Sequence, residues 1–511
     1  MEDTISNDKN NKKNWFLNLF YYFKYITVEP TMWLYMMAFM STTVIEQSLF
    51  IYKACRVDHG LSEEICRNKI NDSNLNNKIQ ITVSNFHQWN DISGHIFPII
   101  LALFIGNWSD KHGRKIPLLF GLFGKFLYSM MIVVNLLNPT WNLNMIFWTA
   151  TIPSAIFGGD VAIFASCFAY ITDVTTLKQR TLRVTILDVV YLSTMPIGIY
   201  LGSYLYNEIF EKSYIIMFLI NTFFLLLSLN YSLIFLKWRT NEFQIPVDTQ
   251  RFFSDFFNKK HVISIYKTVT IKRIAFGRLH LWFLFLSMCL YMFQRSETQM
   301  IFLYTQKTFN WDVVDNSYFR VYKSSLLIIA MSIVARTLDG YIKDSYVVAI
   351  GACSHAIGRI FFAAGKNSTI FYLGATFASF GPIVAPTLRS MTSKVVSAGE
   401  RGKAFAILAV CDNAIPLICS PLYSQIYIKT IDYLPSAFFW LTFVTQVAIL
   451  IIALIIQYTS LSNKDSSSSS IPENNNEQDV CEFDKEMSFL SPSTSSSTLS
   501  LNKKEDVVMV Y

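Results

Sequence analysis

Among the ionisable residues inside long apolar runs of this sequence, five are singled out as candidates: Glu46, His95, Asp160, Asp188 and Arg389. Carboxyl and imidazole groups can take up and release protons, whereas a guanidinium group is shaped to bind a carboxylate or a phosphate. If the apolar runs cross a membrane, charged side chains within them are costly unless they are paired, hydrated or protonated. These residues are therefore candidates for a pathway that carries protons or a charged solute.

A second group of charges lies between two apolar runs, in the segment Gly106-Asn-Trp-Ser-Asp110-Lys-His-Gly113-Arg114-Lys115. Gly106 would permit a close approach of two helices, and Gly113 would permit a tight turn. Asp110 can pair with Arg114, with a neighbouring helix end, or with both. Basic residues alone would only mark membrane topology. The added acid and glycines predict a charged latch that opens in one conformation and closes in another.

Other classes of function lack their residues in this sequence. We find no nucleophile with its base and no cluster of metal ligands, so an integral membrane enzyme is disfavoured. There is no phosphate-binding Gly-Lys-Ser/Thr loop, so energy should come from a gradient instead of ATP. The net charge of +7 is scattered over short connectors, which argues against a nucleic-acid partner. We expect no cofactor and no metal.

The composition requires a lipid environment. Hydrophobic residues make up 52% of the 511 residues and charged residues only 15%, whereas soluble proteins have roughly a quarter of charged residues. The mean hydropathy is +0.33. The 43 Phe residues exceed what one aqueous core can hide. The chain is therefore predicted to be an all-α membrane protein.

Twelve apolar runs reach the roughly 20 residues that a membrane crossing needs. The runs lie at 31–53, 90–108, 115–137, 145–171, 184–206 and 214–236, and at 279–304, 320–342, 345–365, 369–390, 402–427 and 434–457. This pattern predicts two six-helix halves with the solute held between them. The corresponding division of the chain is a cytoplasmic segment 1–30, an N-terminal half 31–236, a cytoplasmic middle loop 237–278, a C-terminal half 279–457 and a disordered cytoplasmic tail 458–511.

The connectors rich in Lys and Arg all fall on one side of these runs, so both termini are predicted to be cytoplasmic and the first run to be an uncleaved anchor. The loop 54–88 is then external. It contains Cys55 and Cys66, which can form a disulfide or remain two free thiols. It also contains Asn71-Asp72-Ser73, an acceptor pattern for glycosylation.

Several motifs resemble those of known transporters. The segment from Gly106 to Lys115 is similar to the loop motif of the major facilitator superfamily. Further motifs resemble the proton-coupled folate transporter family, solute carrier family 46, within that superfamily. These motifs are Val28-Glu29-Pro30, Gly159-Asp160, Phe168-Ala-Tyr-Ile-Thr-Asp173-Val174, Arg180-Thr181-x-Arg183 and Pro386-Thr-Leu-Arg389-Ser-Met-Thr-Ser-Lys394.

This resemblance implies the major facilitator fold and proton-coupled import of organic anions such as folates or muropeptide-like and nucleotide-like solutes. It places Asp188 where the folate branch carries a Glu linked to proton coupling, and Asp160 at the family's acid in the fourth helix. It makes Arg389 the favoured contact of the anion. Glu46 and His95 are further candidates for substrate contacts, although a histidine in such a run is more often a hydrogen-bonded packing residue.

The gate of the resembling family implies a role for Asp173, which we expect to join Arg180 or Arg183 in a charge network. Asp173 is alternatively a satisfied charge at a helix end, and Asp188 is alternatively a partner of Arg183.

The sequence departs from the family at two places. Phe293-Gln294-Arg295 stands where the folate branch has a His in the seventh helix, so proton coupling does not transfer directly. The family's loop Cys beside Trp311-Asp312 is missing, which supports a bridge between Cys55 and Cys66 in place of a loop-to-loop bridge.

The prediction is thus a secondary transporter that imports a small organic anion with protons by alternating access, in the plasma membrane or an endolysosomal membrane. Its partners are the solute, protons and the lipid bilayer. The alternative is a membrane sensor or scaffold on the same fold that does not transport. The oligomeric state stays open.

Overall fold

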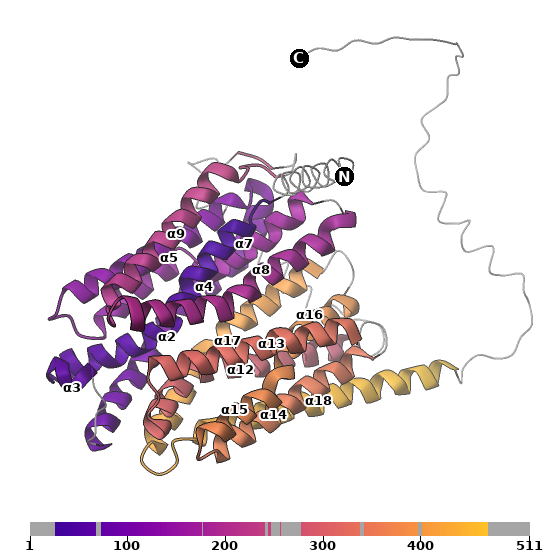
Figure 1. The fold of residues 1–511 in the computed structure, drawn as a ribbon. Helices are drawn as coiled ribbons and strands as arrows, with labels where there is room; N and C mark the ends of the chain where they lie inside the picture. Colours follow the sequence, from indigo (N-terminus) through magenta and orange to yellow (C-terminus); the bar gives the residue numbers. More distant parts are fainter. Residues whose placement is uncertain are drawn as a thin grey trace, which may run out of the picture. The chain divides into compact units, whose positions relative to one another are not determined.

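The computed structural model describes residues 26–67, 73–175, 177–240, 244–246, 256, 277–337, 342–396 and 401–468. These residues are overwhelmingly helical (Figure 1). The expected cytoplasmic segments at both ends, most of the expected middle loop and Asn71 lie outside the described residues.

The described residues of the N-terminal half form six long helical segments, several of them with a π-helical turn. The elements are α2 (Glu29–Lys53) with η1 (Ala54–Asp58), the short α3 (Glu63–Arg67), α4 (Ser73–His112), α5 (Lys115–Leu137), η2 (Phe147–Thr151) with α6 (Ile152–Ile156) and α7 (Gly159–Val174), α8 (Leu177–Tyr204) with η3 (Leu205–Ile209), and α9 (Tyr214–Phe235).

The described residues of the C-terminal half form six more. The elements are α12 (Gly277–Phe309), α13 (Val313–Thr337), α14 (Asp344–Ala364), α15 (Ser368–Phe377) with the 3-10 turn η4 (Ala378–Ile383) and α16 (Val384–Val395), α17 (Arg401–Thr430), and α18 (Ala437–Ser468). The predicted all-α fold of about twelve helices is confirmed.

Eight of the described helical segments are by themselves long and apolar enough to cross a membrane. The other four long helices are α4, α12, α13 and α17. Each of them packs against a helix of the opposite half: α4 against α17 and α12, and α13 against α8 and α2. Polar side chains are tolerated there because they face protein or a cavity instead of lipid. All four helices of lower hydropathy thus lie where the halves meet.

The helix α4 corrects the expected loop 54–88. The loop was expected to run to residue 88, but α4 begins at Ser73, so much of that segment is helical. Its first turns are polar, yet Gln80 and Ser84 are fully buried. The preceding short connection is closed by a disulfide between Cys55 and Cys66. We call this end of the helices the disulfide end.

A row of hydrogen bonds joins α4 to α17 at the disulfide end. The Tyr427 hydroxyl donates to Gln80 Oε1 at 2.6 Å, and the Ser84 and Ser424 hydroxyls lie 2.8 Å apart. The Gln425 amide donates to Gln88 Oε1 at 3.0 Å. These bonds recur about once per helical turn, so the two halves are held together here by neutral polar groups.

The fourth helix of each half is interrupted. In the first half, Gly158 and Gly159 adopt positive φ angles of 85° and 45° between α6 and α7. In the second half, the 3-10 turn η4 contains Pro382 and separates α15 from α16. Interrupted helices at corresponding positions of two halves are typical of transporter binding sites. Asp160 follows the first of these breaks directly.

Candidate functional site

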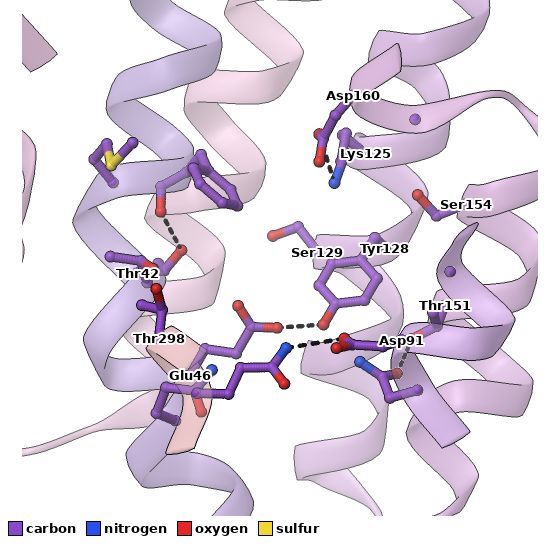
Figure 2. A pocket seen from close by; sticks show the side chains of 18 of the residues that line it. Thr42, Glu46, Asp91, Lys125, Tyr128, Ser129, Thr151, Ser154, Asp160 and Thr298 are labelled. Atoms are coloured by element: carbon purple, nitrogen blue, oxygen red, sulfur yellow. Dashed lines mark hydrogen bonds and ion pairs between the residues drawn. The ribbon is translucent and has the colours of Figure 1, made fainter. Parts of the chain in front are cut away.

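A cavity of about 570 Å³ lies between the two halves. Helices α2, α4, α5, α7, α8 and α9 contribute residues from the first half, and α12, α13 and α17 contribute residues from the second. Figure 2 shows part of its lining. The ionisable residues that line it are Glu46, His87, Asp91, His95, Lys125, Tyr35, Tyr128, Asp160, Arg320 and Lys323.

The carboxyl group of Glu46 on α2 accepts a hydrogen bond from the hydroxyl of Tyr128 on α5 (Figure 2). One turn before Tyr128, Lys125 forms an ion pair with Asp160, with 2.7 Å between Nζ and Oδ1. The Tyr35 hydroxyl also donates to Asp160. The lysine and Asp160 keep 22% and 32% of their side chains exposed, so water in the cavity can reach this pair.

The helix α4 carries Asp91 and His95 into the cavity. Asp91 Oδ1 accepts a hydrogen bond from the side-chain amide of Gln299 on α12 at 2.9 Å, which bridges the two halves (Figure 2). The Nδ1 of His95 lies 2.7 Å from the main-chain oxygen of Asp91, to which it can donate. His95 thus lines the cavity as expected and is also anchored to its own helix.

Two cations on α13 face the cavity from the second half. The Arg320 guanidinium donates to Thr43 Oγ1 of α2 at 3.2 Å, and Lys323 lies three residues further along α13. Neither residue was predicted from the sequence, because the predicted helix began at residue 320 and its first charges resembled a helix end. In the structure α13 begins at Val313, which places both residues well inside the helix. Their spacing of three was the available signal.

Beyond the cavity, Glu297 of α12 and Arg359 of α14 form an ion pair, with 3.1 Å between Oε2 and Nε. Their side chains are 0% and 1% exposed. The guanidinium also stands over the Phe362 ring at 5.3 Å. This pair occupies the interior of the second half and links α12 to α14.

Two predicted site residues lie apart from the cavity lining. Arg389 of α16 pairs with Asp412 of α17, with 2.8 Å between Nη2 and Oδ2, and keeps 43% of its side chain exposed. Asp188 of α8 is half-buried and experiences the positive charge of Arg389. The alternative pairing of Asp188 with Arg183 is not seen, since Arg183 pairs with Glu29 at 2.7 Å.

The loop motif forms a network around Arg114. Its Nε lies 3.0 Å from Asp173 Oδ2, and its Nη1 donates to Ser109 Oγ at 2.7 Å. Asp173 also accepts a bond from the Thr240 hydroxyl at 3.1 Å. The expected partner Arg183 forms an ion pair with Glu29 of α2 instead. The side chains of Asp110 and Arg180 lie outside the described residues.

The remaining motif residues have distinct roles. Gly113 adopts a φ of +103°, the tight turn that was predicted, and its Cα packs against the main chain of Trp238. Lys115 donates to the main-chain oxygens of Leu233 and Leu236 at the end of α9. The close helix approach expected at Gly106 is absent, because an added Cβ there would meet no described atom within 4 Å.

We predict that Asp173→Asn lowers the free energy of unfolding by about 1–2 kcal/mol, because the pair with Arg114 is only 11–19% exposed. Thermal unfolding of the purified protein in detergent measures this. The reversed pair Arg114→Asp with Asp173→Arg should recover part of the loss. A melting temperature of Asp173→Asn equal to that of the wild type would show that the latch carries no stability in this conformation.

The interrupted helices, the two six-helix halves and the charged cavity between them define a multi-pass membrane transporter. Comparison with known proteins agrees. The family model of the Major Facilitator Superfamily matches residues 88–353, and the chain belongs to that superfamily.

Curated relatives confirm the resemblance to solute carrier family 46. A Gallus gallus protein named lysosomal proton-coupled steroid conjugate and bile acid symporter SLC46A3 is 25% identical over 441 residues, which cover 82% of this chain and 91% of that protein. A Drosophila melanogaster protein named probable peptidoglycan muropeptide transporter SLC46 is 23% identical over 444 residues, covering 80% and 81%. The solved structure of the human organic anion transporter MFSD10 has the same fold, with a TM-score of 0.60, 14% identity and coverage of 83% and 97%.

Proposed function

We propose that the protein imports a small organic anion together with protons, by alternating access around the cavity between its halves. The observation that carries this proposal is the lining of the cavity, which contains carboxyl groups able to hold a proton and cations able to hold an anion. Such groups are costly at membrane depth and are retained for a solute or ion pathway. The printed names of the relatives, a proton-coupled symporter and a muropeptide transporter, support the same class.

Glu46 and Asp160 are the proposed proton carriers within the cavity. Both accept hydrogen bonds from tyrosine hydroxyls, from Tyr128 and Tyr35 respectively, and Asp160 is balanced by Lys125. Protonation of Asp160 would release Lys125, which then becomes free to attract an anion. Asp188, near Arg389 and outside the cavity lining, is proposed as a second proton site along the path.

The proposed orientation places both termini in the cytoplasm and the disulfide end outside or in the lumen, in the plasma membrane or an endolysosomal membrane. With the α4–α17 bonds in place, the disulfide end is closed in this conformation. Release of a solute would then occur toward the opposite end, which carries the loop motif.

Uptake into proteoliposomes tests the proposal. Purified protein is assayed with a labelled folate, a sulfated steroid and a muramyl tripeptide, with and without an inward gradient of about two pH units, which supports about a 100-fold concentration ratio for one coupled proton. We expect the gradient to raise uptake of at least one anion and a protonophore to abolish the increase. Glu46→Gln should lose the gradient dependence.

The matched control is Asp312→Asn, an exposed acid in the connection before α13 and away from the cavity. It should keep gradient-driven uptake. Uptake that is equal with and without the gradient would contradict proton coupling. Absence of uptake of all three anions by folded protein would contradict the anion transporter and favour a sensor on the same fold.

A further inference from the structure

The two walls of the cavity carry opposite charge. The wall from the first half contains Glu46, Asp91 and the paired Asp160 and Lys125. The wall from the second half contains the cations Arg320 and Lys323. Once the Lys125–Asp160 pair is set aside, two acids face two cations across the same space.

The two acids bind only neutral donors in the part of the chain that the structure describes. Glu46 accepts from the Tyr128 hydroxyl, and Asp91 accepts from the Gln299 amide at 2.9 Å. Neutral donors stabilise a carboxylate but leave its charge in place. Neither acid has a cation within ion-pair distance among the described residues.

The two cations are also without an acidic partner among the described residues. Arg320 donates to the neutral hydroxyl of Thr43 at 3.2 Å, and Lys323 makes neither a hydrogen bond nor an ion pair there. The charge of Glu297, which lies outside the cavity lining, acts on Lys323, but Glu297 is itself paired with Arg359 at 3.1 Å. The cations at positions three apart on α13 therefore share one face that is open to a ligand.

We infer that the cavity takes an amphoteric solute, whose anionic group lies against Arg320 and Lys323 and whose protonated amine lies against Glu46 and Asp91. This inference rests on the proposed function, since it concerns the solute of that same cavity. A solute with both charges would neutralise both walls at once. A simple anion would neutralise only the α13 wall and would leave two acids to be balanced by protons.

The contact between the two walls limits the class of solute further. Arg320 reaches Thr43, which lies one helical turn before Glu46 on α2. The cationic wall therefore reaches α2 close to the part of that helix that carries an acid of the opposite wall. Amino-acid and peptide-like solutes, which carry an amine and a carboxylate a few bonds apart, fit this arrangement, and the cavity of about 570 Å³ is of the size of small-molecule sites.

A matched pair of ligands tests the inference by binding, independently of transport. The probe is a muramyl tripeptide ending in lysine, with its side-chain amine free or acetylated, titrated into the full chain in lipid nanodiscs. We expect the acetylated form to bind at least tenfold more weakly. In the double variant Glu46→Gln/Asp91→Asn this preference should disappear, because the amine then meets neutral side chains.

Variants of the other wall complete the test. Lys323→Gln should weaken the binding of both forms of the probe by the same factor. Lys429 is an exposed charge near the end of α17, and Lys429→Gln should leave both affinities unchanged. Equal affinity of the two forms, or binding of neither, overturns the inference. Gradient-driven uptake of a sulfated steroid or a folate in the separate transport assay would then still uphold the proposed function.

Discussion

Arg359→Ala lowers the free energy of unfolding by about 3–5 kcal/mol, because it leaves the carboxylate of Glu297 as an unpaired charge in the protein interior. The two side chains are 1% and 0% exposed and lie 3.1 Å apart. Water cannot replace the lost guanidinium without entering the interior of the second half. Thermal unfolding of the purified protein, followed by size-exclusion fluorescence, measures the loss.

The control for this prediction replaces both partners. Glu297→Met/Arg359→Met removes both charges and retains side-chain volume, and buried ion pairs replaced in this way are often neutral in stability. We expect the double variant to melt well above Arg359→Ala. If Arg359→Ala alone melts like the wild type, the pair is not buried in the folded protein as the structure has it.

Gly202→Ala forces α8 away from α2 and destabilises the protein. A Cβ at Gly202 would stand 2.6 Å from the carbonyl carbon of Ser41 and 2.7 Å from its Cα, closer than real contacts allow. The obstacle is main chain and cannot rotate away, so the loss should reach the upper part of the roughly 1–3 kcal/mol typical of overpacking. Yield of monodisperse protein and its melting temperature report the effect.

Gly106→Ala is the matched control, since it adds the same methyl group to another helical glycine that has no described atom within 4 Å of its Cβ position. It should melt like the wild type or slightly higher, because alanine favours helix more than glycine does. A Gly202→Ala protein as stable as Gly106→Ala would rule out the close packing of α2 and α8.

The helices were predictable from the sequence wherever they face lipid, because such helices are apolar. The run 115–137 coincides with α5, because that helix is apolar throughout. The first turns of α4 were expected to be loop, because they are polar and hydropathy identifies only helices that face lipid. Gln80, Ser84 and His87 are buried against other helices instead, at 0–1% exposure. Gln80 and Ser84 form hydrogen bonds there with Tyr427 and Ser424 of α17, partners that sequence alone does not reveal.

The candidate site was predictable only in part, for a related reason. Glu46 and Asp160 interrupt apolar runs and do line the cavity. Lys125 lies inside a run that predicts an ordinary spanning helix, and Arg320 lies at the predicted start of a helix. Neither was therefore predicted to belong to the site. Arg389 showed the same signal as Glu46, but its partner Asp412 lies on another helix, and pairing between distant segments cannot be read from one sequence.

The neutral hydrogen bonds between α4 and α17 have a consequence for the speed of the transport cycle. Each such bond contributes only about 0.5–1.5 kcal/mol net, because water offers an equivalent partner when the bond opens. An interface of apolar contacts would instead expose apolar surface to water on opening. An interface of ion pairs would leave desolvated charges without partners. Tyr427, Ser424 and Gln425 can exchange their partners for solvent one turn after another. The activation barrier for separating the halves is thereby divided into small steps, and thermal motion can cross each of them.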